Sequence, residues 1–258
     1  MKALLDRLRR RKESRSLARR AIPEALWSLT LARLPFIARL PKLDLADLRR
    51  LASLFLDSKE FTGAGGLVVT DEMAVCIAVQ ACLPVLRFGL KPYEGFVGIV
   101  VHADEVVARR SHIDEVGVVH EFDEVLSGEA MDGGPIMLSW HDVSEAGTSA
   151  DWGYNVVVHE FAHVLDMADG AADGVPALPG TAAREAWLDV LQTEYDSHCH
   201  AVDAGIDTLL DPYGATAISE FFAVAVESFF VTPHEMRAEH PDLYWMLARY
   251  FRQDPTGA

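Results

Sequence analysis

The stretch VVVHEFAHVLD carries two histidines and a glutamate at the spacing of a metal-binding helix. His159 and His163 are four residues apart, so on a helix their imidazoles project from one face, about 40° apart. Two imidazoles presented in this way can bind one tetrahedral Zn²⁺ at about 2.0–2.1 Å. Glu160 would lie beside the metal, where its carboxylate can take a proton from an activated water and pass it to a leaving amine. The stretch therefore predicts one zinc ion per chain in a hydrolytic site.

Two near copies of the motif elsewhere in the chain fail the same test. The tripeptide His-Glu-Phe recurs at His120, but Glu124 stands where the second histidine is needed, and this stretch reads as a strand or turn. At His234 the corresponding position is Ala238. A core helix with two incidental surface histidines is the alternative for residues 156–166. The metal interpretation is favoured there, because two histidines and a glutamate facing an apolar core without a metal would be costly to desolvate.

A zinc peptidase needs a third protein ligand, and the residues alone leave three candidates. Asp169 is ten residues after His159, but Asp166 stands where that arrangement turns sharply at a glycine, so it fits poorly. Glu220 and Glu227 are seven residues apart in SEFFAVAVESFF, hence on one helical face, and either could reach the zinc. Asp166 is expected to accept a histidine ring N–H and orient that ring.

The elements that must position these side chains follow from the spacing of apolar residues. Glycine and proline clusters separate them, as in TGAGG at 62–66 and in residues 168–180. Helices come first, then strands, then helices, which favours an α+β fold in one compact unit. The spacing predicts helices within 23–60 and over 70–83, 151–167, 182–202, 217–231 and 233–252, and strands over 96–103, 115–122 and 133–140.

Composition and charge narrow the class of protein. The chain has 258 residues, half of them apolar, and a net charge of −16. Residues 1–20 contain nine Lys or Arg against two acidic residues, so this arm is basic and the rest of the chain is strongly acidic. Such a body repels phosphates, so we expect no nucleic-acid partner. No apolar run is long enough to cross a membrane, and three cysteines without a disulfide pattern favour the cytoplasm.

Several long motifs resemble the Mlc titration factor A family of zinc-dependent peptidases. They are GYNVVVHEFAHVLDMADGAADGVP, GGPIMLSW, DPYGATAISEFFAVAVESFF and YFRQDP, with KEFTGAGGLVVTDEM, QACLPVL and VVHEFDEVLSGEA upstream. The resemblance runs from about residue 20 to the end. It implies a zincin-like α+β fold related to the catalytic domain of anthrax lethal factor, with an active-site helix, a small sheet and flanking helices. The domain expectation is an arm over 1–20, disordered or helical, and one peptidase domain over 21–258, helical over about 21–95 and catalytic over about 96–258.

The resemblance also assigns roles to individual residues. By position, the zinc ligands match His159, His163 and Glu220, the general base matches Glu160, and an active-site tyrosine matches Tyr213. A phenol there can donate to the oxyanion that forms during hydrolysis. Glu227 then becomes a supporting or structural carboxylate. The strand GGPIMLSW is expected to be the edge strand that pairs with an extended peptide substrate.

The expected function is zinc-dependent peptide hydrolysis, aminopeptidase-like by resemblance. The family name implies a further link, to regulation of sugar uptake through a transcriptional repressor. The alternative is a non-catalytic, zinc-stabilised protein that sequesters a transcription factor. The sequence favours the enzyme, because a purely structural zinc needs neither Glu160 nor a phenol. A zinc hydrolase acting on something other than peptides would use the same residues.

Overall fold

The structure is a computed structural model that describes residues 13–113, 119–130 and 133–257. Residues 13–20 of the basic arm are helical, and residues 1–12 lie outside the described part of the chain. The larger α-helices are α2 (Glu24–Arg33), α3 (Pro35–Ala38), α4 (Lys42–Ser58), α5 (Asp71–Cys82), α6 (Trp140–Glu145), α7 (Val156–Asp166), α8 (Thr181–Asp203), α9 (Ile218–Val231), α10 (Pro233–Glu239) and α11 (Pro241–Phe251). The strands are β1 (Glu60–Gly63), β2 (Gly98–His102), β3 (Val106–Ile113), β4 (Val119–Leu126), β5 (Gly128–Ala130) and β6 (Ile136–Ser139).

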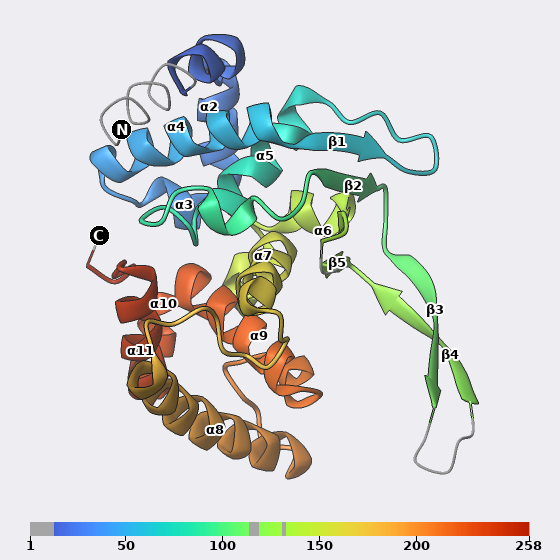
Figure 1. Ribbon diagram of the computed structural model, residues 1–258, viewed down its shortest axis with the longest axis vertical. Coiled ribbons are helices and arrows are strands. Elements are labelled where there is room, and N and C mark those ends of the chain that lie inside the picture. The colour runs from blue at the N-terminus through green and yellow to red at the C-terminus, as the bar shows by residue number, and fades with distance from the viewer. Residues whose placement is uncertain (1–12, 114–118, 131–132, 258) are drawn as a thin grey trace.

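The strands form one small mixed sheet and one separate ribbon. The sheet has the order β1-β2-β6-β5, in which β1, β2 and β6 run parallel and β5 pairs antiparallel with β6. β3 and β4 pair only with each other and project from the body of the molecule (Figure 1). The α+β, zincin-like fold class expected from the sequence is confirmed: a small sheet is combined with many helices.

The expectation that GGPIMLSW supplies the edge strand was wrong. Its strand, β6, lies inside the sheet, between β2 and β5. The edge belongs to β5, whose Gly128 pairs with Leu138 and whose Ala130 pairs with Ile136. A strand of three residues has too little alternation to be recognised in a sequence, which is why β5 was not expected.

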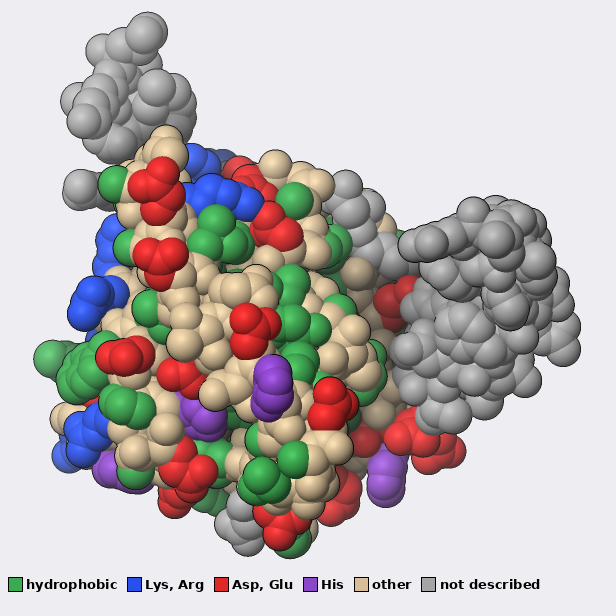
Figure 2. All heavy atoms as spheres, turned by 90° about the horizontal axis from the view of Figure 1, so that it is seen from below, with side chains coloured by type: hydrophobic (Ala, Val, Ile, Leu, Met, Phe, Trp, Pro, Cys, Tyr) green, Lys and Arg blue, Asp and Glu red, His purple; other side chains and the backbone are tan. Residues whose placement is uncertain are grey.

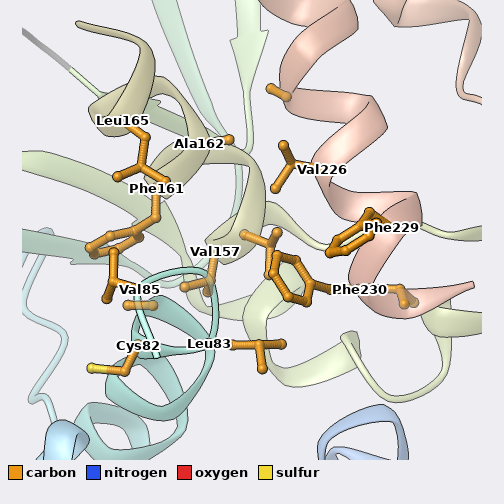
Figure 3. Packing of buried hydrophobic residues seen from close by; sticks show 14 of the residues in the cluster. Cys82, Leu83, Val85, Val157, Phe161, Ala162, Leu165, Val226, Phe229 and Phe230 are labelled. Carbon is orange, nitrogen blue, oxygen red and sulfur yellow. The ribbon is translucent and has the colours of Figure 1, made fainter. Parts of the chain in front are cut away.

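Helices α5, α7 and α9 meet at the centre of the molecule, and packing against α5 and α9 fixes the position of α7. Figure 3 shows apolar side chains of α7 between those of α9 on one side and those at the end of α5 on the other. On α7, Phe161 is fully buried, and its ring centroid lies 4.9 Å from that of Tyr93 and 5.7 Å from that of Phe55. Burial of an aromatic side chain of this size contributes roughly 1.5–3 kcal/mol. The packing therefore holds the helix that carries His159 and His163 rigidly.

Local chemistry sets where these helices begin and end. Thr70 caps α5 as expected, its side chain accepting from the Met73 N–H. The helix expected from 151 starts only at Val156, because Gly153 adopts a left-handed φ of 75° and Asn155 caps the next turn. The helix expected over 233–252 is two helices, since Pro241 ends the first and starts the second.

The surface reflects the acidic composition of the chain. Acidic side chains are spread over the face in Figure 2, whereas basic ones lie mainly along one side of it. Part of the basic arm is held by ion pairs to α4, Arg19 with Asp57 at 2.9 Å and Glu13 with Arg50. In the part of the chain that the structure describes, no helix has the length and apolar character needed to cross a membrane.

Candidate metal centre

Helix α7 carries both histidines, and Asn155 fixes where this helix begins. The Asn155 side chain accepts from the Val158 N–H and so caps the first turn. One turn later His159 and His163 project from the same face, with ring centroids 4.8 Å apart. Most other side chains of α7 are buried, and both imidazoles point toward Glu220 on α9.

Helix α9 completes a cluster of three potential metal ligands by placing Glu220 opposite the histidines. The Nε2 atoms of His159 and His163 are 3.2 Å apart, and Glu220 Oε2 lies 3.0 Å from the first and 3.2 Å from the second. Tetrahedral coordination at about 2.0–2.1 Å separates ligand atoms by about 3.3–3.4 Å. The near-equilateral triangle of two nitrogens and one oxygen therefore fits a zinc-sized ion, and it is the one such cluster within the described residues.

The other candidates for the third ligand take different positions. Glu227 lies behind His159, with Oε1 2.7 Å from Nδ1, the ring nitrogen that faces away from Glu220. Asp169 lies 3.5 Å from Arg184 and is not part of the cluster. The expected contact between Asp166 and a histidine ring is absent among the described residues. Asp166 Oδ2 instead accepts the Gly174 N–H at 3.0 Å, which closes the turn after α7.

A buried chain of hydrogen bonds runs from His159 back to α5. Nδ1–H of His159 donates to Glu227, and the second oxygen of Glu227 accepts the Asn155 N–H. The Asn155 amide donates to Gln80 Oε1 at 2.7 Å, and the Gln80 amide donates to the Cys76 carbonyl at 3.1 Å. With Nδ1 protonated in this way, Nε2 is the ring nitrogen of His159 that remains to bind a cation.

The histidines and glutamates of the cluster shift one another's pKa values. Burial alone lowers the pKa of His159, but the charge of Glu227 and hydrogen bonds to Glu220 and Glu227 outweigh it and hold that pKa well above its usual value. Burial raises the pKa of Glu220, but hydrogen bonds from His159 and His163 more than offset this. The pKa of Glu220 is therefore far below its usual value, and its carboxylate is ionised. Without a metal the cluster holds protons between its ligand atoms, and a cation would have to displace them.

Glu160 is buried next to the cluster, against strand β5. A methyl group added at Gly128 would lie 2.5 Å from Glu160 Oε1 and 2.7 Å from its carboxyl carbon, so any larger residue there would force the Glu160 side chain to shift. Burial raises the pKa of Glu160 to about 7, although the neighbouring His159 and His163 lower it. A carboxylate with a pKa near neutrality can both accept and return a proton. A bound cation would draw this pKa back down.

Tyr213 lies over the cluster from the short 3-10 turn Pro212–Ala215, which precedes α9. Its ring centroid is 6.2 Å from that of His159, and its side chain is 45% exposed. The Asp211 side chain fixes this turn by accepting the Tyr213 N–H at 2.8 Å. All five residues expected at the site therefore lie in one place: His159, Glu160, His163, Tyr213 and Glu220.

Three further residues of this centre were not expected from the sequence. Asn155 and Gln80 connect Glu227 to α5, and Gly128 makes room for Glu160. Two of them had a signal: Gln80 is a lone amide in the apolar run AVCIAVQAC, and Asn155 immediately precedes an apolar helix. Gly128 had none, since its role depends on a contact with a helix 32 residues further along the chain.

Most of the chain is similar to known proteins. The model of the glucose-regulated metallo-peptidase M90 family matches residues 7–252. An uncharacterized protein of Synechocystis sp. is 36% identical over 242 residues, which cover 93% of this chain and 88% of that protein. Mlc titration factor A of Yersinia pestis is 33% identical over 232 residues, 86% of this chain and 82% of that protein.

Proposed function

The chain belongs to the glucose-regulated metallo-peptidase M90 family, and we propose that it is a zinc-dependent peptidase with aminopeptidase-like activity. The observation that carries the proposal is the triangle of His159, His163 and Glu220 ligand atoms beside a buried Glu160. Two imidazoles and one carboxylate are a common catalytic zinc set, which leaves a coordination position for water or substrate.

We assign the metal to these three ligands, one ion per chain. When bound, zinc would supply Lewis acidity at this point, polarising a substrate carbonyl and lowering the pKa of a water molecule. His159 is held for this task by Glu227, which fixes its tautomer and the direction of its Nε2 lone pair. Glu220 is ionised and supplies the negative charge that a divalent cation needs.

Glu160 is the general base and then the general acid. Its carboxylate takes the proton of the attacking water, so that the oxygen can add to the carbonyl carbon of the peptide. The same proton then passes to the leaving nitrogen as the C–N bond breaks, which releases a carboxylic acid and an amine. Strand β5 packs against Glu160 at Gly128 and keeps its carboxylate at the edge of the cluster during both proton transfers.

Tyr213 supports the step in which negative charge collects on the carbonyl oxygen. Its phenol can donate a hydrogen bond to that oxygen, a contact that strengthens as the charge develops and therefore lowers the barrier. Its partial exposure leaves it able to follow a bound substrate. We place the substrate backbone alongside β5, because β5 ends the sheet and packs directly on Glu160 through Gly128.

We also propose, from the name of its relatives, that this chain has a partner among the transcriptional repressors that control sugar uptake. The alternative function, sequestration of such a repressor without hydrolysis, predicts that Glu160→Gln leaves binding and the regulatory effect intact. The proposed setting is the cytoplasm, which the three free cysteines support.

The test is cleavage of a mixed peptide library, read by mass spectrometry, with wild type and Glu160→Gln loaded with zinc to the same level. We expect products only from the wild type, shortened from the N-terminus. Internal cuts would replace the aminopeptidase assignment with an endopeptidase. No product from either protein, with zinc bound in both, would overturn the enzymatic proposal for free peptides.

A further inference from the structure

A large cavity adjoins the candidate metal centre at the C-terminal end of α7. Its volume is about 1080 Å³, and neither the three cluster residues nor Glu160 and Tyr213 line it. Its walls come from the end of α7 and the loop that follows it, from α8 and α11, from the segment 88–96, and from residues immediately before β6. The proposed reaction gives this space no role.

The cavity lies further along the same stripe of α7 that carries Glu160. On α7, Val164 is four residues after Glu160 and therefore on the same stripe of the helix, about 6 Å further along its axis. Val164 lines the cavity, as does Met167 beyond it. On the opposite side, β5 contacts Glu160 through Gly128, and Gly133 and Gly134, a few residues further along the chain, line the cavity. A peptide that runs alongside β5 is thus directed toward this space.

The size of the cavity exceeds what one amino-acid side chain requires. Pockets for drug-sized ligands measure roughly 300–1000 Å³, and this one, at about 1080 Å³, slightly exceeds that range. Several consecutive residues of a peptide would occupy it. A free amino acid amide or a dipeptide would leave most of it filled with water.

The walls are apolar and aromatic. Trp187 and Met246 are buried at the cavity, Tyr250 is partly buried, and Trp245 remains 43% exposed. The Trp187 and Tyr250 rings pack edge to face, with centroids 5.4 Å apart, so this wall is rigid. An exposed tryptophan beside a preformed apolar hollow offers a large contact area to a ligand with bulky apolar side chains.

The charged residues that line the cavity are mostly basic, against the trend of the chain. Lys91, Arg249 and Arg252 are exposed there, with Asp242 as the one acidic residue, in a protein of net charge −16. Within the described residues, Lys91 and Arg249 make no ion pair. The cavity therefore combines an apolar interior with side chains that attract carboxylates.

We propose that this cavity is the substrate-recognition site of the peptidase. It binds several residues of the peptide on one side of the scissile bond, and it selects segments in which large apolar or aromatic residues stand next to acidic ones. The inference rests on the proposed function, because it assigns the cavity to the substrate of that same site.

The direct test measures binding without cleavage, in zinc-loaded protein carrying Glu160→Gln. The probe is a fluorescein-labelled decapeptide with phenylalanine, tryptophan and glutamate residues, followed by fluorescence anisotropy. Ala186, on the cavity side of α8, is replaced by tryptophan to fill part of the space, and Gln192→Trp, at an exposed position on the opposite face of the same helix and outside the lining, is the control. We expect Ala186→Trp to weaken binding by roughly ten-fold or more and Gln192→Trp to change it less than about two-fold. Equal binding by both variants would overturn the proposal, as would no binding by the parent.

The charge preference is tested with Arg249→Glu and a probe in which glutamine replaces each glutamate. The parent should prefer the glutamate probe, and Arg249→Glu should reduce or reverse that preference. No preference in the parent would refute the acidic part of the proposal. Cleavage of the peptide library distinguishes failure of the recognition site from failure of the peptidase assignment. If wild type and Ala186→Trp give the same products at the same rates, the peptidase assignment stands and the recognition site is wrong. If the wild type cleaves nothing, the peptidase assignment itself fails.

Discussion

Glu227 should control the affinity of the metal centre without touching the metal. Its two oxygens accept from His159 Nδ1–H and from the Asn155 N–H. In Glu227→Gln, one of the two positions must hold an NH₂ group, which faces an N–H donor instead of accepting from it. Whichever way the amide turns, one of the two hydrogen bonds is lost and the ring of His159 is held less firmly.

The expected size of the effect follows from this geometry. Loss of a carboxylate that orients a metal-binding histidine costs about 10- to 100-fold in metal affinity, which corresponds to about 1.4–2.7 kcal/mol. Full burial of Glu227 places the effect toward the upper end, because water cannot replace the lost acceptor. The three metal ligands themselves stay in place.

The assay is competition for zinc between the protein and a chromogenic chelator at fixed pH, with circular dichroism to confirm the fold. The chain offers a matched control in Glu194, which makes the same kind of contact, 2.8 Å from His240 Nδ1, outside the cluster. Glu194→Gln should leave zinc affinity unchanged. Wild-type affinity in Glu227→Gln, or an equal loss in both variants, would refute the reasoning.

Three more perturbations have defined outcomes. Gly128→Ala should push the Glu160 carboxylate aside and lower kcat/KM by about 10- to 100-fold, with zinc content unchanged; full activity would show that Glu160 tolerates the shift. Tyr213→Phe should lower kcat by about 100-fold with little change in KM, and a change in KM alone would make the phenol a binding group. Lys59 is buried against two backbone carbonyls, and burial lowers its pKa from 10.5 to about 8. Since the unfolded chain then binds more protons between pH 8 and 10.5, stability should rise with pH across that window, and urea unfolding of Lys59→Met should lose that slope.

The sequence was most informative where one helix carried the chemistry. His159, Glu160 and His163 share one stretch of chain, so their spacing alone defined a metal-binding face. Glu220 could not be separated from Glu227 by spacing, because both lie on one face of α9. Their positions along the helix distinguish the two glutamates. Glu220 lies beside Nε2 of His159, the nitrogen that faces the cluster, whereas Glu227 lies beside Nδ1, which faces away from it.

Contacts between distant segments escaped prediction for a physical reason. The role of Gly128 depends on β5, a strand too short to show a pattern, and on its distance from α7 in the folded chain. The assignment of the sheet edge to GGPIMLSW failed in the same way, because periodicity indicates a strand but not its neighbours. Pro241, in contrast, was a visible helix boundary that the long apolar pattern outweighed.

The most direct test of the account is a zinc titration of the metal-free protein, with peptide hydrolysis as the readout. The account predicts that the rate rises in proportion to added zinc and levels off at one equivalent per chain, because His159, His163 and Glu220 form a single site. His163→Ala should show no such rise at the same zinc concentrations. Hydrolysis by the metal-free protein, or a break at two equivalents, would contradict the claim that this one cluster carries the activity.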